Sequence, residues 1–207
     1  MPGLFFSFDG IDGVGKSTQS ALFGEWLAAR GHEVVFCRDP GSTPLGEEIR
    51  RLLLDPAAVK FDRTAEMLLY MAARAQLVDQ VIAPALAAGK TVISDRFLLA
   101  NVVYQGHAGG LDPAAIWEVG RVAIKGIEPA LTFVLDLPEQ EAAARLTREL
   151  DRMESQGEAF HRRLRQGYLA EGARNPAKIV ILDASRPVEP IQADIRKQAE
   201  KVLRHGD

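Results

Sequence analysis

The segment Gly10–Ser17 reads GIDGVGKS, and it constrains the fold more than any other part of the chain. It fits the phosphate-loop pattern G-x-x-x-x-G-K-[ST], in which backbone N–H groups at the start of a helix point at phosphate oxygens. An apolar run typical of a strand precedes the loop at 4–8, and a segment with helical period follows it at 16–30. A strand, a glycine-rich loop and a helix in this order predict a nucleotide-binding α/β fold.

Four further apolar runs do not alternate with polar residues, which is typical of strands buried on both faces of a parallel sheet. Helical segments alternate with these runs, so the chain is expected to form an α/β doubly wound sheet of five parallel strands with helices on both faces. Pro84 is expected to kink one helix, and Gln156-Gly157 to break another. The further strands are predicted at 33–37, 91–94, 131–136 and 178–182, and the further helices at 63–88, 112–125, 139–171 and 187–204.

Length and composition narrow the class of protein. The length of 207 residues predicts a single domain, 1–207. The composition, with 47% hydrophobic and 26% charged residues, excludes a disordered chain. A net charge of −3 argues against partners such as nucleic acid or an acidic membrane. The sequence predicts a cytoplasmic location for three reasons. It has one cysteine, it lacks the basic start of a signal peptide, and it lacks an apolar stretch long enough for a membrane helix.

The phosphate loop predicts which residues hold ATP and magnesium. Lys16 is expected to reach the β and γ phosphates, and the Ser17 hydroxyl is expected to bind Mg²⁺. Asp95 and Asp136 each follow an apolar run, and Asp95 is the favoured second magnesium residue because Arg96 follows it. No N-K-x-D segment is present, and the D-x-x-G pattern occurs only inside the loop, so a GTPase is excluded. The predicted ATP-binding residues of the loop are Gly10, Ile11, Asp12, Gly13, Val14, Gly15, Lys16, Ser17 and Thr18.

Polar residues in apolar surroundings indicate a second pocket. Tyr70 and Arg74 lie one helical turn apart, so a ring and a planar donor could stack on a flat ligand and read its edge. The alternative for Tyr70 and Arg74 is a core tyrosine beside an arginine that reaches solvent. Arg50 and Arg51 stand on a further helical run near the phosphate loop, and the alternative for them is a solvated helix face. Further along, Asn101, Tyr104 and Gln105 stand among apolar residues and are suited to line a pocket.

Several motifs in sequence order resemble those of the bacterial thymidylate kinase family, whose members are nucleoside-monophosphate kinases. The resemblance covers essentially the whole chain and rests on five segments: FDGIDGVGKST, RDPGSTPLGEEIRRLLLD, YMAARAQ, ISDRF with NVVYQG, and LDRME followed by a basic helix. It implies transfer of the γ-phosphoryl group of ATP to dTMP, with Mg²⁺ as cofactor, a short helical lid at about 140–157, and a homodimer.

The resemblance also implies individual roles. Asp9 would contact the acceptor 3′-hydroxyl and the magnesium shell, and Tyr70 would stack on thymine. The implied catalytic residues are Lys16, Arg96, Asp9, Arg148 and Arg152. The implied dTMP-binding residues are Asp9, Arg38, Arg50, Tyr70, Arg74, Arg96, Asn101, Tyr104 and Gln105, with Arg145, Arg148 and Arg186 added to the ATP site.

The chain departs from the family pattern at a few positions. Tyr70 stands where Phe is usual, and Ala100-Asn101 replaces a Ser-Ser pair. Asp12 occupies a phosphate-loop position that is arginine in some members, so the transition-state cation is expected from the lid. Three alternatives remain: a kinase for another pyrimidine monophosphate or a deoxynucleoside, a non-catalytic nucleotide-binding regulator, and an ATPase that acts on a protein partner.

Overall fold

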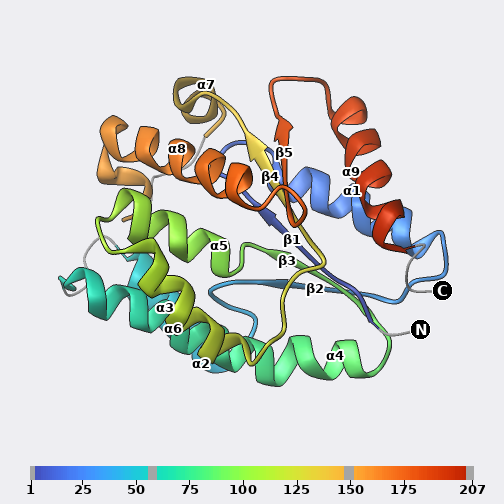
Figure 1. The fold of residues 1–207 in the computed structure, drawn as a ribbon, viewed down its shortest axis with the longest axis horizontal. Helices are drawn as coiled ribbons and strands as arrows, with labels where there is room; N and C mark the ends of the chain where they lie inside the picture. Colours follow the sequence, from blue (N-terminus) through green and yellow to red (C-terminus); the bar gives the residue numbers. More distant parts are fainter. Residues whose placement is uncertain (1–2, 56–59, 147–151, 204–207) are drawn as a thin grey trace.

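The structure is a computed structural model that describes residues 3–55, 60–146 and 152–203. Its centre is a five-stranded sheet with the order β2-β3-β1-β4-β5, and every neighbouring pair of strands is parallel (Figure 1). This confirms the predicted fold class. The strands are β1 (Phe5–Asp9), β2 (Val34–Arg38), β3 (Thr91–Asp95), β4 (Leu131–Asp136) and β5 (Ile179–Asp183).

Helices connect the strands. Asp62 and Asp112 cap two of them, each accepting hydrogen bonds from backbone N–H groups of the first turn. The helices are α1 (Lys16–Ala28), α2 (Pro44–Leu54), α3 (Arg63–Leu77), the π-helical η1 (Val78–Ile82), α4 (Ala83–Ala87), α5 (Leu98–Asn101), the π-helical η2 (Val102–Ala108), α6 (Pro113–Ile124), α7 (Glu139–Ala144), the 3₁₀-helical η3 (Glu154–Gln156), α8 (Glu158–Arg174) and α9 (Val188–Leu203).

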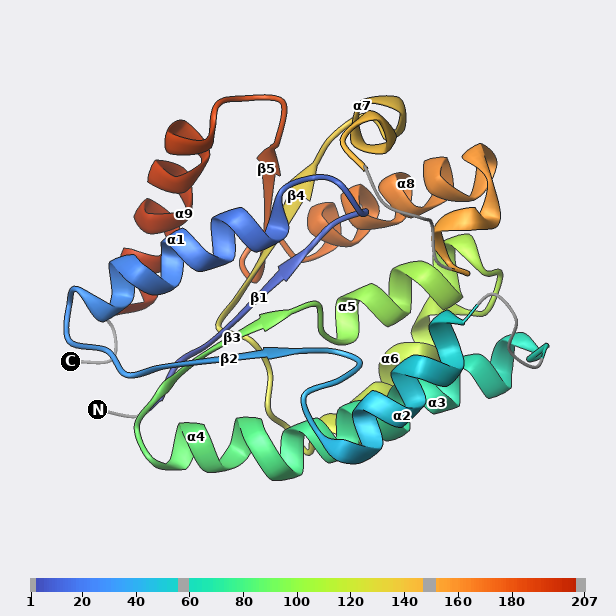
Figure 2. The ribbon, with the colours of Figure 1, turned by 180° about the vertical axis from the view of Figure 1, so that it is seen from behind.

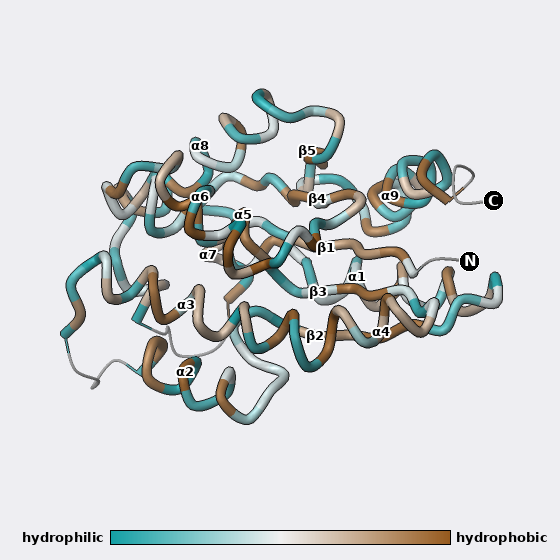
Figure 3. Tube along the Cα trace, turned by 60° about the horizontal axis from the view of Figure 1, so that its bottom comes forward, coloured by the Kyte–Doolittle hydropathy of each residue, from teal (hydrophilic) through white to brown (hydrophobic). Residues whose placement is uncertain are grey.

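The helices form two layers around the sheet. Helices α1 and α9 pack together on one face, and α3, α4, α6 and α8 cover the other (Figures 1 and 2). Along the helices hydrophobic and hydrophilic residues alternate, as the hydropathy-coloured trace shows (Figure 3). Within the described ranges no helix combines the length and the apolar character that crossing a bilayer requires.

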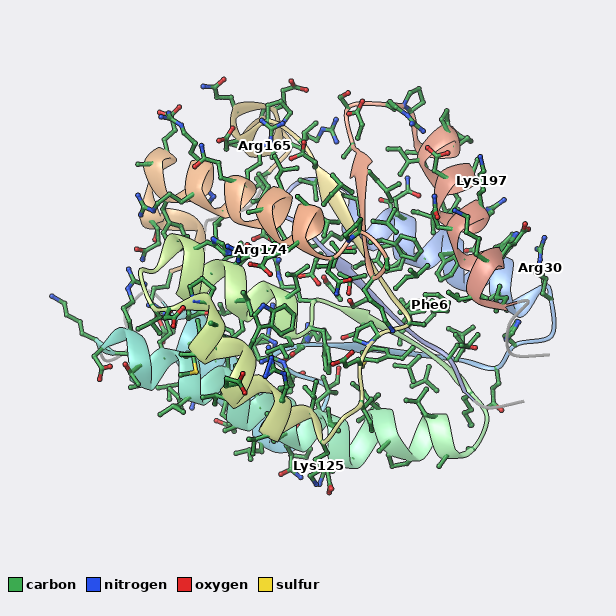
Figure 4. The ribbon with its side chains drawn as sticks, in the orientation of Figure 1. Phe6, Arg30, Lys125, Arg165, Arg174 and Lys197 are labelled. Atoms are coloured by element: carbon green, nitrogen blue, oxygen red, sulfur yellow. The ribbon has the colours of Figure 1, made fainter. Side chains whose placement is uncertain are left out.

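An aromatic cluster fills the core between β1, β4 and α1. The Phe6 ring lies 5.1 Å from Phe23 and 6.2 Å from Phe133, measured between centroids, and all three side chains are fully buried. Figure 4 labels Phe6 inside the fold. Because large rings are buried against strand β1, the strand is held firmly where it delivers the phosphate loop.

The predicted elements are found, and their ends differ in an informative way. Strands β1, β2, β3 and β5 each extend one residue further, to Asp9, Arg38, Asp95 and Asp183, because backbone pairing continues past the last apolar side chain. The expected helix at 63–88 contains the π-helical turn η1, which ends two residues before Pro84. The predicted break at 156–157 is confirmed, since α8 begins after Gly157 at φ 86°.

Candidate active site

The phosphate loop lies at the carboxyl end of β1, the central strand of the sheet. Strand β1 pairs with β3 on one side and β4 on the other, and the connections from β1 and β3 leave in opposite directions. In doubly wound sheets such a reversal opens a crevice at the carboxyl ends of the strands. The charged residues that end β1, β2 and β3 therefore gather at this crevice.

Two glycines of the loop allow close packing that no other residue would permit. A Cβ atom at Gly10 would lie 2.5 Å from the Leu135 carbonyl oxygen, and one at Gly13 would lie 2.2 Å from the Ala142 carbonyl oxygen. Both residues also have positive φ angles, 126° and 84°. The loop is thus wedged between β4 and α7, with its backbone free to face a ligand.

Lys16 lies folded over the phosphate loop. Its Nζ donates to the Gly10 and Ile11 carbonyl oxygens, at 3.2 and 2.9 Å, and lies 3.6 Å from Asp12 Oδ1. Burial and the nearby Arg96 lower the pKa of Lys16 below its usual range. The ammonium is therefore placed where phosphate oxygens would meet the loop.

Arg96 faces the same carboxylate from strand β3. Its Nη2 donates to Asp12 Oδ1 at 2.8 Å and its Nη1 donates to the Gly10 carbonyl at 2.7 Å. Burial lowers the pKa of Arg96, but Asp12 and nearby tyrosines outweigh this and hold it well above its usual range. Arg96 also has φ 66°, a left-handed conformation that is rare outside glycine and typical of functional sites.

A cavity of about 90 Å³ opens beside this pair, on the α2 and α3 side of the crevice. Its lining combines an aromatic ring, apolar groups and both signs of charge, as expected for an orienting pocket. Seven of the nine predicted dTMP-binding residues line it: Arg50, Tyr70, Arg74, Arg96, Asn101, Tyr104 and Gln105. The other lining residues are Asp12, Asp39, Pro40, Leu54, Ala100 and Met153.

Arg74 is almost completely buried in the wall of this cavity. Its Nε donates to Asp39 Oδ2 at 2.5 Å, and its Nη1 donates to Asn101 Oδ1 at 3.0 Å. The alternative of an arginine that reaches solvent is therefore wrong. The Asp39 carboxylate compensates the charge of the buried Arg74 guanidinium. No sequence pattern predicted this pairing, because the two residues lie 35 positions apart.

Asp9 does not reach the cavity. It is fully buried, and its Oδ1 accepts a 3.3 Å hydrogen bond from the Tyr168 hydroxyl of α8. Burial raises the pKa of Asp9 to about 7, although Arg96 and Lys16 act to lower it. Asp12, and not Asp9, lines the cavity. Tyr168 was missed because its contact with Asp9 spans 159 positions.

Ser17 and Asp95 provide oxygen atoms suited to magnesium. Ser17 lies in the first turn of α1, and the buried Asp95 Oδ1 and Asp9 Oδ2 have no hydrogen-bond partner. Asp136, the alternative, is bound by Arg165 at 2.7 and 2.9 Å. Among the described residues no group of three or more His, Cys, Asp or Glu side chains that could hold a metal ion occurs.

Arg38 and Arg50 come from the loop after β2 and from α2. Arg50 lines the cavity and donates to the Pro40 carbonyl at 3.1 Å. Arg38 points elsewhere, since its Nη2 donates to Glu47 at 2.8 Å and half of its side chain is exposed. The structure therefore does not bring Arg38 to the cavity, because Glu47 is the nearer anion.

The predicted lid arginines occupy different places. Arg145 donates to the Ala184 carbonyl at 3.4 Å, next to the loop that holds Arg186, which pairs with Asp194 at 2.7 Å. Arg152 binds Glu66 at 2.6 Å and the Leu53 carbonyl at 2.6 Å, so the structure places it by α2 and α3 rather than on the phosphate loop. Arg148 lies outside the described residues.

Helix α8 closes the crevice from the β4 side. Arg165, labelled in Figure 4, holds Asp136 at the end of β4, and Tyr168 follows one turn later. In the last turn of the helix, the buried Glu171 accepts from His107 of η2 at 2.8 Å and from Trp117 of α6 at 3.2 Å. The helix is thus held at its middle and in its last turn, with Tyr168 between the two contacts.

Comparisons with known proteins identify the family to which the chain is similar. Residues 8–195 match the family model described as thymidylate kinase. The chain is 45% identical to the thymidylate kinase of Symbiobacterium thermophilum, over 97% of this chain and 94% of that protein. It is 46% identical to the thymidylate kinase of Pelotomaculum thermopropionicum, over 98% and 95%.

A solved structure extends the likeness to the fold. The crystal structure of thymidylate kinase from Ehrlichia chaffeensis superimposes with a TM-score of 0.77 at 30% identity, covering 95% of this chain and 98% of that one. The family model and both sequence relatives span the phosphate loop, the cavity and the loop after β5. The chain therefore belongs to the thymidylate kinase family.

Proposed function

We propose that this chain transfers the γ-phosphoryl group of ATP to dTMP, giving ADP and dTDP. One observation carries the proposal: Lys16 of the phosphate loop and Arg96 of the neighbouring cavity both face Asp12 Oδ1, at 3.6 and 2.8 Å. The cation of a donor site and the cation of an acceptor site thus meet at one point. A phosphoryl group passing between two nucleotides would cross the crevice there.

The cavity has the polarity that a nucleoside monophosphate requires. Tyr70 and Arg74 lie at the end that would hold thymine, by stacking and by hydrogen bonds to its edge. Arg50 and Arg96 provide the positive charge for the acceptor phosphate. Between them, Tyr104 and Asp12 would face the sugar, so the acceptor hydroxyl falls to Asp12 in place of Asp9.

The chemistry needs charge neutralisation more than a general base. The acceptor phosphate is already an oxyanion, so the barrier is repulsion between two anionic groups. Catalysis then rests on positioning and on cations arranged around the transferring group. Lys16 would act on the donor side and Arg96 on the acceptor side, each held in place by backbone carbonyls and Asp12.

Ser17 and Asp95 would hold Mg²⁺ beside the phosphates. The unpaired buried oxygen of Asp95 fits this role, because an unsatisfied carboxylate oxygen is costly unless a cation meets it. When bound, the ion would neutralise charge on the donor phosphates. The residues of the chain would orient the two nucleotides and, through Lys16 and Arg96, neutralise the remaining charge.

The segment at about 140–157 would serve as a lid within a single domain formed by 1–207. Arg145 and Arg186 flank the loop after β5, where the adenine of ATP is expected. Arg148 and Arg152 are the proposed lid cations, and Arg152 would have to leave Glu66 to reach the phosphates. A closed lid would exclude water and prevent ATP hydrolysis.

The proposed assembly is a homodimer, whose interface would be formed by helices α2, α3 and α6. Helices α2, α3 and α6 lie side by side (Figure 1), and Leu45, Leu68 and Val122 are exposed on them. Chromatography with light scattering would give twice the chain mass, and Val122→Glu would reduce the measured mass.

The cytoplasm is the proposed location, because the reaction consumes ATP and a metabolic nucleotide.

Product analysis tests the proposed reaction. The protein is incubated with ATP and Mg²⁺, with dTMP, dUMP, dCMP, thymidine or no acceptor, and ADP and acceptor products are measured. Equal amounts of ADP and dTDP, formed only with dTMP or more slowly with dUMP, are expected. A nucleoside kinase would phosphorylate thymidine, an ATPase would release ADP without acceptor, and a regulator would do neither.

A further inference from the structure

A chain of buried polar side chains runs beneath the acceptor cavity and links two carboxylates. It begins in the loop after β2, crosses α3, α5 and η2, and returns to the first turn of α3. Each neighbouring pair is joined by a hydrogen bond. Its members, in order, are Asp39, Arg74, Asn101, Gln105, Glu66 and Arg152.

The bonds form an unbroken sequence. From Asp39 Oδ2 the chain passes to Arg74, whose Nη1 donates to Asn101 Oδ1 at 3.0 Å. Asn101 Nδ2 donates to Gln105 Oε1 at 2.6 Å, and Gln105 Nε2 donates to Glu66 Oε1 at 2.9 Å. Glu66 Oε2 then accepts from Arg152 Nη2 at 2.6 Å. The first five side chains are 3% exposed or less.

The charged residues determine which way both amides point. An ionised carboxylate only accepts, so Glu66 requires the NH₂ group of Gln105 on its side, and the Gln105 oxygen then faces Asn101. Arginine only donates, so Arg74 requires the oxygen of Asn101, and the Asn101 NH₂ group then faces Gln105. The two requirements come from opposite ends of the chain and agree, so reversing either amide breaks at least one buried hydrogen bond.

A fixed amide orientation matters because Asn101 and Gln105 line the cavity. Thymine presents a carbonyl acceptor at the position where cytosine presents an amino donor. An amide that could turn over would present either group and accept both bases. An amide that is locked reads one pattern and rejects the other.

We propose that Glu66 is a specificity-determining positioning residue, which locks Gln105 while Arg74 fixes Asn101, so that the pocket selects thymine over cytosine. Glu66 does not line the cavity, so it acts through Gln105. Its charge is balanced by Arg152 and by Arg63, whose Nη1 lies 3.7 Å from Oε1. This inference rests on the proposed function.

The test is Glu66→Gln, because glutamine keeps the shape but can both donate and accept. The ratio of kcat/KM for dTMP to that for dCMP should fall about ten-fold or more, with a higher KM for dTMP and a lower KM for dCMP. Glu171→Gln is the matched control, since Glu171 is also a buried glutamate with three partners but does not touch either amide.

Each result has a definite meaning. A dTMP-to-dCMP ratio within three-fold of the wild type in Glu66→Gln would overturn the proposal, as would an equal loss in Glu171→Gln. If Glu66→Gln does not fold, Gln105→Met replaces it, because methionine fills the space and interrupts the chain; an unchanged ratio there also overturns the proposal. Wild-type protein that does not phosphorylate dTMP would instead contradict the proposed function itself, and this inference with it.

Discussion

Arg96 and Asp12 form an ion pair across the crevice, with Nη2 of the arginine 2.8 Å from Oδ1 of the aspartate. The two residues lie 84 positions apart and come from the carboxyl ends of two adjacent strands. The pair joins the phosphate loop to the acceptor cavity, so it marks the point at which phosphoryl transfer is proposed to occur.

Arg96→Ala should remove catalysis with little effect on the fold. Losing a cation at the transferring group is expected to lower kcat about 10³-fold or more, because the guanidinium neutralises charge that develops during the transfer. Steady-state kinetics with dTMP and thermal melting would measure both effects. Near-normal turnover would show that Arg96 does not serve the acceptor phosphate.

Arg96→Gly should lose the same activity but be more stable than Arg96→Ala. The backbone at this position has φ 66°, which costs a residue with a Cβ atom about 1 kcal/mol and glycine nothing. Denaturant unfolding of the two variants isolates the backbone effect, since both lack the guanidinium. If the two are equally stable, the left-handed conformation stores no free energy at this position.

Arg74→Ala should destabilise the protein by about 3–5 kcal/mol, because it leaves the buried Asp39 carboxylate without its cation. Adding Asp39→Asn should recover much of this loss, since a neutral amide has no charge to compensate. Urea unfolding of the single and double variants would measure the recovery. A double variant as unstable as the single one would show that packing, and not the buried charge, dominates.

The same Arg74 substitution should weaken base selection. A pocket that donates to a thymine carbonyl loses that preference when the donor is removed, so the KM for dTMP should rise and the preference over dCMP should shrink. Arg74→Lys keeps the charge that Asp39 requires and is the better variant for kinetics. Unchanged selectivity among dTMP, dCMP and dUMP would show that Arg74 does not read the base.

Asp9→Asn should stabilise the protein, and increasingly so as the pH rises. Burial raises the pKa of Asp9 from 3.8 to about 7 in the folded state, so folding favours the neutral form. The wild type therefore loses stability relative to Asp9→Asn between about pH 4 and pH 7, and the difference levels off above pH 7.

Denaturant unfolding from pH 5 to pH 8 would show this trend. Asp79→Asn is the control, since Asp79 lies exposed on the surface beside Lys125. A stability difference that is constant with pH, or that favours the wild type at pH 8, would contradict the account of Asp9.

The sheet and the phosphate loop were predictable because local patterns encode them. Apolar runs such as 131–136 predict buried strands. The glycines and Lys16 of the phosphate loop stand at the fixed spacing of its motif. The carboxyl ends of β1, β2, β3 and β5 were missed by one residue, because charged residues such as Asp95 take part in backbone pairing without appearing apolar. Pro84 was expected to kink a helix, and the chain accommodates it with the π-helical turn η1.

The cavity was only partly predictable. Tyr70, Arg74 and Gln105 stood out as polar residues on apolar stripes, and the structure brings them together. Asp39, Glu66 and Tyr168 did not, because their roles depend on partners 35 or more positions away. The sequence shows that carboxylates stand at the end of β1 and in the phosphate loop. It does not show that Asp12 lines the cavity while Asp9 is buried against Tyr168.

The most direct test is a crystal structure of the protein with dTMP and a non-hydrolysable ATP analogue. The account predicts thymine between Tyr70 and Arg74, the acceptor phosphate on Arg96, and the analogue's terminal phosphate on Lys16. A thymine nucleotide elsewhere, such as in the cavity of about 320 Å³ beside Trp117 between α6 and α8, would contradict it.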